Sequence, residues 1–428
     1  MLKSAIKLLP FGALVLTLIL HAGSVLAQDP SVISSSLKIP ASSDGAMDGV
    51  NLQRTNSYPG KSAQLTNKVL WKSPKFFVMN YEAALTKGVD PASLEYAEVG
   101  FSDPVIADGL LYFRLGRGVR QYVLFALDQS NGAAVWRFES KMPLSAPAVA
   151  GDTLYLESTE GILYALDART GREKWRYSAK DEHWTVGASP AVADGMIYFT
   201  GLAGNLNALD MKTRQPKWVF KSKGTLTAPT VTESTIYVGS EKGFIYALDK
   251  KSGEEQWNFK AKAKPNNPVI MDGSVYFRTE AGVLFALDAK TGQEKWNTKV
   301  GGKVQSVSPI TTVTIGTSLA VHNNSIFFAG AENETDFLYA IDSSNGQQRW
   351  KFATNGPCRA PIVTDDIVYV GCVGKLFAID AQNGTMKWGI EAKTESEGKT
   401  VKVVPSSPAL NNGALFYVTD EGFVYALQ

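Results

Sequence analysis

The sequence has few of the residues that build most metal and redox sites. It holds 2 cysteines and 3 histidines in 428 residues. Two cysteines exclude a disulfide-rich scaffold and a four-cysteine zinc site. One of the histidines, His21, lies near the N-terminus, which argues against a multi-histidine metal centre. Candidate functional residues must therefore be sought among other residue types.

Neither sign of charge is in excess. The chain has 43 Lys and Arg against 41 Asp and Glu, a formal net charge of +2. Lys3 and Lys7 account for this surplus, because no acidic residue precedes Asp29. Nucleic-acid-binding proteins need a basic excess to match phosphates, so the balance argues against this class. With 44% hydrophobic residues, the chain can bury a large core.

Long apolar runs are also missing, apart from one at the N-terminus. Two lysines precede the apolar residues Leu8 to Leu20, and Val25-Leu26-Ala27 gives the small-x-small spacing of a cleavage site. We predict that residues 1–27 form a secretory signal peptide cleaved after Ala27. The alternative is a membrane anchor, but the run is short for a bilayer and ends at His21.

The next segment reads as a flexible leader. Residues 28–50 are rich in Ser, Asp, Pro and Gly, a composition that does not support a packed core. No cysteine stands near the predicted cleavage point, so we expect no lipid attachment at that point. The predicted signal peptide and the absence of a cysteine at its cleavage point together predict a periplasmic or secreted protein.

The body of the chain repeats one motif. An Asp and a Trp stand eight residues apart seven times, with an Ala two residues before each Asp. A Gly stands four residues before the Trp in every copy except one, where Arg214 replaces it. The pairs are Asp128/Trp136, Asp167/Trp175, Asp210/Trp218, Asp249/Trp257, Asp288/Trp296, Asp342/Trp350 and Asp380/Trp388.

A second element precedes each copy. It consists of a proline, an apolar run, a turn and another apolar run, as in residues 189–199. Asp194-Gly195 is a two-residue hairpin signal, because Gly adopts positive φ without strain. Each repeat therefore predicts four short antiparallel strands, A to D, with the Trp on D. Repeats of this length and strand content are typical of propeller blades.

The two ends of the repeat region complement each other. The last repeat reaches Gln428 without an Asp or a Trp, whereas Trp71 stands in an isolated strand pattern near the start. We therefore predict an all-β, eight-bladed β-propeller over 51–428, whose last blade takes 67–73 as its outer strand, with 74–100 as an insertion. Closing the ring in this way removes an open sheet edge.

Eight tryptophans are expected to be structural and not site residues. Each buries ~150–250 Å² between neighbouring blades. They are Trp71, Trp136, Trp175, Trp218, Trp257, Trp296, Trp350 and Trp388.

The string Ala-x-Asp-x-x-(Thr/Ser/Asn)-Gly-x-x-x-Trp resembles the tryptophan-docking motif of pyrroloquinoline-quinone-type propeller repeats, over nearly all of residues 67–428. The resemblance implies one of two functional classes. One comprises the quinone-dependent dehydrogenases. The other comprises non-catalytic propellers, such as the outer-membrane assembly lipoprotein. A fold shared by both classes does not choose between them.

The chain departs from both classes. The dehydrogenases typically carry a disulfide between adjacent cysteines over the cofactor, and longer loops with calcium ligands. Here Cys358 and Cys372 are separated by 13 residues. The assembly lipoprotein carries a lipidated cysteine, which this chain lacks. We therefore expect an exported, monomeric, non-catalytic propeller without a cofactor, acting as a binding or scaffold module of the cell envelope.

Two alternatives stay open. The first is an oxidoreductase for alcohols or sugars that uses pyrroloquinoline quinone and calcium on the channel axis. The second is a carbohydrate-binding or sensor propeller. No residue set in the sequence specifies a substrate or a partner.

Breaks in the repeat mark candidate sites. Arg114, Arg117 and Arg120, with two glycines among them, are candidates for an anion site; the alternative is a solvated loop. His183 and Trp184 lie in a connection between repeats, where an exposed Trp is a candidate binding anchor. The alternative for Trp184 is ordinary packing between blades.

Two further breaks lie in longer insertions. Glu332, Glu334 and Asp336 carry oxygen ligands suited to calcium, and a solvated acidic loop is the alternative. The insertion 74–100 contains a short helical pattern at 81–87 and is a candidate plug or partner surface.

The channel mouth is expected to be basic. In a propeller, the D-to-A and B-to-C connections lie on one face, which we call the mouth face. Basic residues stand near the start of several A strands, and an envelope protein or an acidic ligand is the expected partner. They are Lys141, Lys223, Lys264, Lys303, Arg359 and Lys402.

The two cysteines fall in one predicted A–B hairpin. A two-residue turn at Asp365-Asp366 pairs position 358 with 373, so a disulfide between Cys358 and Cys372 requires a bulge at Gly371 or a three-residue turn. Export to an oxidising compartment favours the disulfide; the alternative is two buried, inert thiols. A disulfide would hold Arg359 at the mouth as a contact residue.

Overall fold

The computed structural model describes residues 46–47, 58, 65, 67–76, 99–117, 121–178, 188–201, 204–302, 318–354, 356–396 and 399–428. All 36 elements assigned in this part of the chain are β-strands, and within it no helix has the length and apolar character needed to cross a membrane. The predicted signal peptide, the short helix at 81–87 and nearly all of the leader lie outside these residues.

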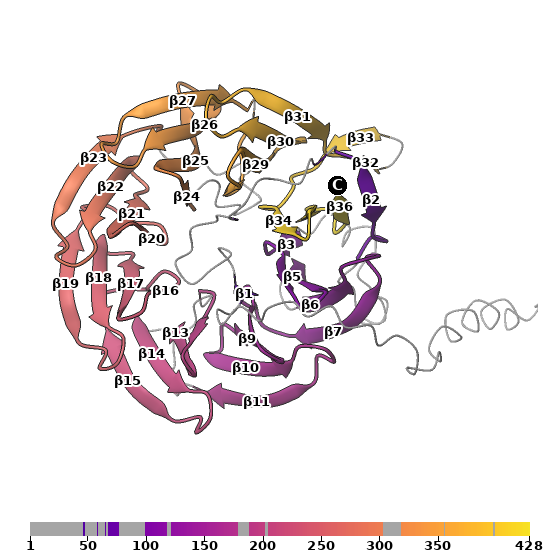
Figure 1. Cartoon of the computed structure of the whole chain (residues 1–428). Helices are drawn as coiled ribbons and strands as arrows, with labels where there is room; N and C mark the ends of the chain where they lie inside the picture. Colours follow the sequence, from indigo (N-terminus) through magenta and orange to yellow (C-terminus); the bar gives the residue numbers. More distant parts are fainter. Residues whose placement is uncertain are drawn as a thin grey trace, which may run out of the picture. The chain divides into compact units, whose positions relative to one another are not determined.

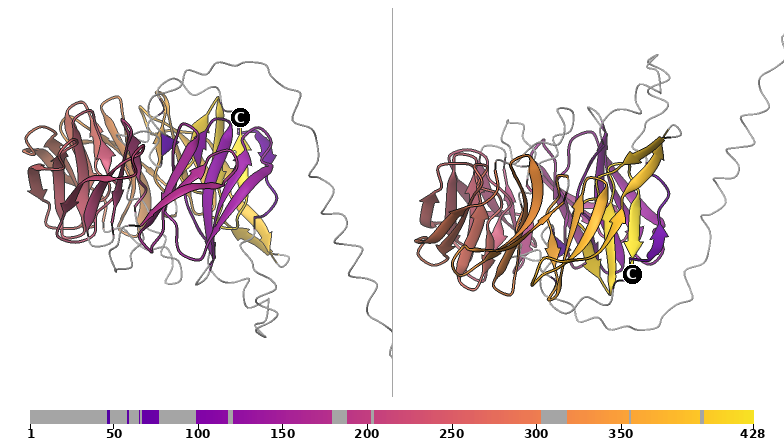
Figure 2. Two further views of the ribbon diagram at one scale, coloured as in Figure 1. Left: turned by 90° about the horizontal axis from the view of Figure 1, so that it is seen from below. Right: turned by 90° about the horizontal axis from the view of Figure 1, so that it is seen from above.

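The strands form eight blades around a common axis (Figure 1). Edge-on, the blades make a single layer, so that the strand ends form two faces (Figure 2). The predicted all-β, eight-bladed propeller is therefore confirmed.

The blades are numbered in chain order, and their strands are given from the axis outward. Blades 1 to 4 consist of β4 (Val105–Ala107), β5 (Leu110–Arg117), β6 (Gln121–Asp128), β7 (Ala134–Ser140); β8 (Ala148–Ala150), β9 (Thr153–Glu157), β10 (Ile162–Asp167), β11 (Glu173–Ser178); β12 (Ala191–Ala193), β13 (Met196–Thr200), β14 (Asn205–Asp210), β15 (Pro216–Lys221); and β16 (Thr230–Val231), β17 (Thr235–Ser240), β18 (Phe244–Asp249), β19 (Glu255–Lys260).

Blades 5 to 8 follow the same order. They consist of β20 (Val269–Met271), β21 (Ser274–Arg278), β22 (Val283–Asp288), β23 (Glu294–Lys299); β24 (Ala320–His322), β25 (Ser325–Glu332), β26 (Thr335–Asp342), β27 (Gln348–Ala353); β28 (Ile362–Val363), β29 (Ile367–Cys372), β30 (Lys375–Asp380), β31 (Met386–Glu391); and β34 (Ala409–Asn411), β35 (Ala414–Val418), β36 (Val424–Leu427), β2 (Val69–Lys72).

Four strands lie outside this pattern. β1 (Ala46–Met47) pairs with the innermost strand of blade 2, and β3 (Val99–Phe101) pairs with the far end of β5. β32 (Lys393–Ser396) and β33 (Lys399–Lys402) form a separate hairpin between blades 7 and 8.

The repeated Ala has a packing role. In blade 5, Ala286 stands opposite Tyr276 on one neighbouring strand and opposite Trp296 on the other. The two rings lie 6.2 Å apart between centroids, and Ala286 itself is fully buried. A larger side chain at this position would compete with both rings for the same space.

The repeated Gly receives the Trp of the preceding blade. A Cβ atom on Gly253 would lie 2.5 Å from the ring of Trp218, and Gly253 has a φ of +74°. The indole of Trp218 also donates a hydrogen bond of 3.2 Å to the carbonyl of Lys250 in the same turn. Gly is therefore required both for the backbone conformation and for the space that the ring fills.

Blade 3 shows how the one copy of the repeat without this Gly is accommodated. Arg214, which replaces the Gly, adopts a φ of 57°. Its guanidinium lies 5.5 Å from the ring centroid of Trp175 in the preceding blade. A cation above the indole face therefore replaces the close contact with a glycine backbone.

The N-terminal part of the chain closes the ring. β2 pairs with β36 in antiparallel register, and the indole of Trp71 donates to the carbonyl of Gln129 in blade 1. Trp388 of blade 7 docks on the carbonyl of Leu65, because blade 8 has no C–D turn of its own. The predicted closing strand is confirmed.

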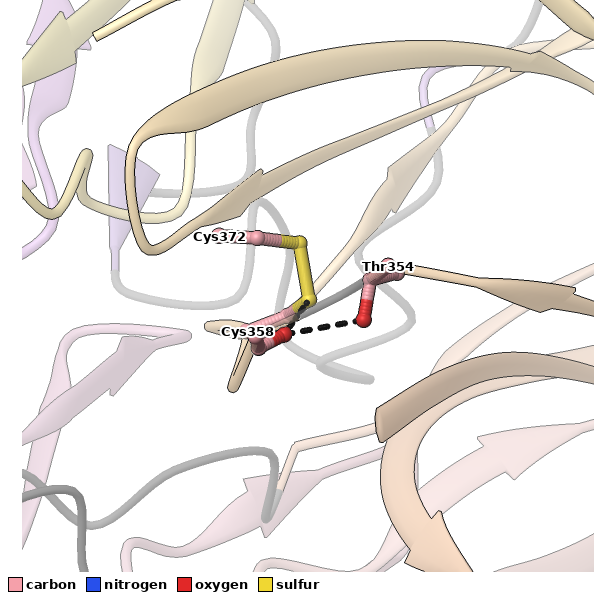
Figure 3. The surroundings of a disulfide bond; sticks show 4 residues. Thr354, Cys358 and Cys372 are labelled. Atoms are coloured by element: carbon pink, nitrogen blue, oxygen red, sulfur yellow. Dashed lines mark hydrogen bonds between the residues drawn. A yellow bond between two sulfur atoms is a disulfide. The ribbon is translucent and has the colours of Figure 1, made fainter. Parts of the chain in front are cut away.

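Cys358 and Cys372 form a disulfide in blade 7, shown in Figure 3 beside Thr354, which donates to the carbonyl of Gly356. The hairpin has the two-residue turn, because Val363 opposes Val368, yet Cys358 opposes Cys372. The extra residue lies on the A-strand side, among 359–361. Both expected ways of aligning the cysteines, a bulge at Gly371 and a three-residue turn, were therefore wrong.

This one-residue shift belongs to the repeat. In blade 2, Ala148 opposes Tyr155 but Leu144 opposes Ser158, and blade 4 repeats the shift with Leu226 and Ser240. The proline at the start of strand A stands inside the shifted stretch, where its ring removes a donor from the ladder. The cysteines therefore occupy a pair of positions that the repeat itself brings together.

Thiol titration checks the disulfide. We expect no free thiol in the unfolded, unreduced protein, and we expect Cys358→Ser with Cys372→Ser to lower the free energy of unfolding by ~3 kcal/mol, because the bond closes a loop of about 15 residues. Two titratable thiols per chain in the unreduced protein would disprove the bond.

Candidate functional site

Two of the candidate arginines converge at the mouth face. Arg114 lies on β5 of blade 1, and Arg359 precedes β28 of blade 7. The carboxylate of Asp103 acts electrostatically on both guanidinium groups, and Asp420 of blade 8 acts on Arg359. We call Asp103, Arg114, Arg359 and Asp420 the mouth cluster. It joins blades 7, 8 and 1 at the seam where the ring closes.

Backbone and ring contacts hold the cluster. The Asp103 carboxylate accepts the N–H of Ser407 at 2.9 Å. The guanidinium of Arg359 stands 4.5 Å from the ring centroid of Phe101, and the N–H of Arg359 donates to Gly371 beside the disulfide. These contacts hold the charged groups of Asp103 and Arg359 in place at a seam that also contains an aromatic ring.

Burial opposes the charge on both arginines. It lowers the pKa of Arg114 and of Arg359, and the nearby Asp103 counteracts the effect in both cases. Within the described part of the chain, the Nε atoms of both side chains are enclosed and have no hydrogen-bond partner. The cluster therefore retains donors for a carboxylate or a similar acceptor.

Burial also raises the pKa of Asp420 to about 6, although its carboxylate accepts the N–H of Val404 and faces Arg359. A carboxyl whose folded-state pKa exceeds its unfolded value near 3.9 binds more protons when folded. Stability then falls as pH rises between these two values.

Asp420→Asn is expected to remove this component of the pH dependence. The variant should gain stability relative to the parent between about pH 4 and pH 7, because it has no buried carboxyl to ionise. Urea unfolding of both proteins at pH 4.5 and pH 7.5 measures the difference. Parallel pH profiles for the two proteins would contradict the assignment.

Most of the other candidates cannot be placed. Arg120, His183, Trp184 and Lys303 lie outside the described residues, as does the side chain of Arg117. The structure therefore brings together Arg114 and Arg359. The binding roles expected of the other five candidates stay predictions.

The acidic loop of blade 6 does not gather its carboxylates. Glu332 is bound by Lys351 at 2.8 Å and receives the hydroxyl of Tyr339, and burial raises the pKa of Asp336. Among the described residues, no three acidic, histidine or cysteine side chains are placed to share a metal ion. Calcium takes six to eight oxygen ligands, so the residues described here do not fit a calcium site.

The mouth face carries both signs of charge. Lys264 pairs with Glu280 at 3.4 Å, and Lys242 pairs with Glu241 at 3.4 Å. Lys141, Lys223 and Lys402 are exposed. The neighbouring acids therefore reduce the basic character expected from the lysines alone.

Asp103 was missed by the sequence reasoning, although a signal was present. It stands directly before Pro104 at the start of strand A. The corresponding residues before the other strand-A prolines are all uncharged: Ala146, Ser189, Ala228, Asn267, Ser308, Ala360 and Ser407. A comparison of equivalent repeat positions would have singled it out.

Solved structures with the same fold fall into several functional groups. BamB from Moraxella catarrhalis is 17% identical, with a TM-score of 0.57, over 77% of this chain and 97% of that one. The quinohemoprotein alcohol dehydrogenase from Comamonas testosteroni is 15% identical, with a TM-score of 0.66, over 90% and 80%. The computationally designed Ika8 protein is 12% identical, with a TM-score of 0.64, over 84% and 99%. At these identities the likeness shows the fold alone.

No curated protein matches the chain. A family model does, over residues 63–193, 119–258, 181–388 and 242–428, which confirms the resemblance drawn from the repeat. Because these matches together span residues 63–428, the chain belongs to the family described as outer membrane protein assembly factor BamB.

Proposed function

We propose that this protein is a non-catalytic scaffold of the cell envelope that takes part in outer-membrane protein assembly, and that it binds a protein partner through the mouth cluster. Membership of the assembly-factor family supports the process. The cluster supports the contact surface, because its two arginines retain enclosed donors beside fixed carboxylates.

The course of the N-terminal segment carries the preference for a scaffold. β1 pairs with β8, the innermost strand of blade 2. The N–H of Tyr58 donates to the carbonyl of Val363 on β28, the innermost strand of blade 7. If this chain were a quinone-dependent dehydrogenase, the resemblance would imply a cofactor on the channel axis. Here the chain itself lies against the strands that line the axis.

A capture experiment tests the partner surface. We expect the parent protein to retain envelope proteins from an extract, and Arg359→Gln to lose them while keeping its melting temperature within a few degrees. Arg349→Gln is the matched control, because Arg349 is exposed on the outer strand β27 and pairs with Asp342. Equal capture by the parent and by Arg359→Gln would refute this surface.

A second measurement tests the absence of catalysis. Purified protein is incubated with pyrroloquinoline quinone and calcium, and its absorption spectrum and dye-linked alcohol oxidation are recorded. We expect neither a bound quinone chromophore nor turnover. Both signals together would replace the scaffold with an oxidoreductase.

A further inference from the structure

Arg278 is a buried cation at the seam between blades 5 and 6. It is the last residue of β21, and only 2% of it is exposed. Its Nη2 donates to the carbonyls of Val300 and Gly302, at 3.2 and 2.9 Å, in the connection that leads to blade 6. The guanidinium also lies 5.1 Å from the ring centroid of Phe328 on β25.

These contacts satisfy one side of the guanidinium. Nε and Nη1 are enclosed and have no hydrogen-bond partner among the residues that the structure describes, and these two atoms carry three of the five N–H donors of an arginine. Unpaired donors buried away from water are costly. The arrangement therefore points to an acceptor that the described chain does not supply.

The other buried charges of the described chain are handled differently. Lys250, 8% exposed, has the carboxylate of Asp194 at 2.6 Å. Glu157 is 5% exposed, and burial raises its pKa well above the ordinary value, which favours the neutral, protonated form. Arg278 has neither solution: burial lowers its pKa to about 10, and it remains charged at pH 7.

The surroundings of Arg278 leave its guanidinium close to the backbone. A Cβ atom on Gly301 would lie 3.2 Å from Nη2, and one on Gly330 would lie 3.3 Å from it. One glycine of the connection between blades 5 and 6 and one glycine of β25 thus flank Nη2, and β21 and β25 are neighbours across the seam (Figure 1). Backbone without side chains at such a position permits close approach to a charged group.

We propose that Arg278 is an anion-binding residue that takes an oxyanion of the carboxylate or phosphate class at the seam between blades 5 and 6. The carbonyls of Val300 and Gly302 hold one edge of the guanidinium in place, and Phe328 supports its face. Nε and Nη1 then donate to the oxyanion, which supplies the missing countercharge. This site is separate from the mouth cluster and does not depend on the scaffold function.

Thermal unfolding tests the site. The melting temperature is measured in millimolar inorganic phosphate, in millimolar acetylglutamate amide, and in chloride at matched ionic strength. We expect at least one of the two anions to raise the melting temperature of the parent by about 2 °C or more over chloride. A rise with phosphate alone identifies a free oxyanion, and a rise with acetylglutamate amide identifies a carboxylate.

Variants give the decisive comparison. Arg278→Met is expected to abolish the anion-specific rise, whereas Lys250→Met, which removes a buried cation that already has its carboxylate, should lose stability and keep the rise. General effects of phosphate on protein hydration act on all three proteins alike. Arg278→Gln serves if Arg278→Met does not fold. The proposal fails if neither anion stabilises the parent, or if the Arg278 variants respond as the parent does.

Discussion

Deletion of residues 28–75 is expected to open the propeller and cause the protein to aggregate. The deletion removes β2, which pairs with β36, and the carbonyl of Leu65, which receives the indole of Trp388. It also removes Ser73, whose N–H and hydroxyl oxygen both bond to the backbone of Val424. Blade 8 would then expose the edge of β36 to other chains.

Size-exclusion chromatography with light scattering measures the outcome. Deletion of residues 28–43 is the control and should remain monomeric, because the compact unit that contains the propeller begins at Asp44. A monomeric 28–75 deletion that melts at the temperature of the parent would show that β2 does not close the ring.

Trp257→Ala is expected to lower the free energy of unfolding by ~3–5 kcal/mol. Trp257 donates to the carbonyl of Ala289 at 3.1 Å in the next blade and packs against Tyr237 of its own blade. It therefore acts on stability, and the folded fraction of the variant should bind partners as the parent does. A variant of unchanged stability that has lost binding would reverse this role.

A pair of glycine substitutions isolates the docking contact. Gly292 and Gly273 have similar positive φ values, +72° and +66°, but a Cβ on Gly292 would lie 2.6 Å from Trp257, whereas one on Gly273 would meet nothing within 4 Å. Urea unfolding should show that Gly292→Ala costs ~1–3 kcal/mol more than Gly273→Ala. Equal costs would mean that the backbone conformation alone requires the glycine.

The repeat made most of the architecture predictable. Contacts that recur in the same way in successive blades determine the spacing of Ala, Asp, Gly and Trp, because the Gly must receive a ring from the neighbouring blade and the Ala must fit between two rings. Each constraint recurs once per blade, so it is visible along the sequence. The partial last repeat and the isolated Trp71 revealed the ring closure for the same reason.

The register of the cysteine hairpin was predictable only in part. Counting from the turn put Cys358 opposite position 373, and the residue that restores the match lies among 359–361. This shift depends on how strand A leaves the ladder near its proline. The hairpins of blades 2, 4, 5 and 8 contain the same shift, but the side-chain pattern alone does not reveal it, because few residues are involved.

The tertiary structure alone determines which residues meet in the mouth cluster. Arg114 was singled out with Arg117 and Arg120 as a break in the repeat, and Arg359 as a basic residue near the start of a strand A. Nothing in the sequence indicated that both would face Asp103. Their meeting depends on the closure of the ring, which brings blades 7, 8 and 1 together, and Asp420 joins them from the last blade.

The sequence by itself determined the strands, the number of blades and the way the ring closes, since these follow from spacings repeated along the chain. Only the tertiary structure decided which charges are buried and which have a countercharge. Lys250 and Arg278 are both buried cations, yet one meets Asp194, whereas the other meets backbone carbonyls and a ring and, among the described residues, no carboxylate. That difference depends on contacts that occur once in the ring and do not recur from blade to blade, and composition and periodicity do not encode such contacts.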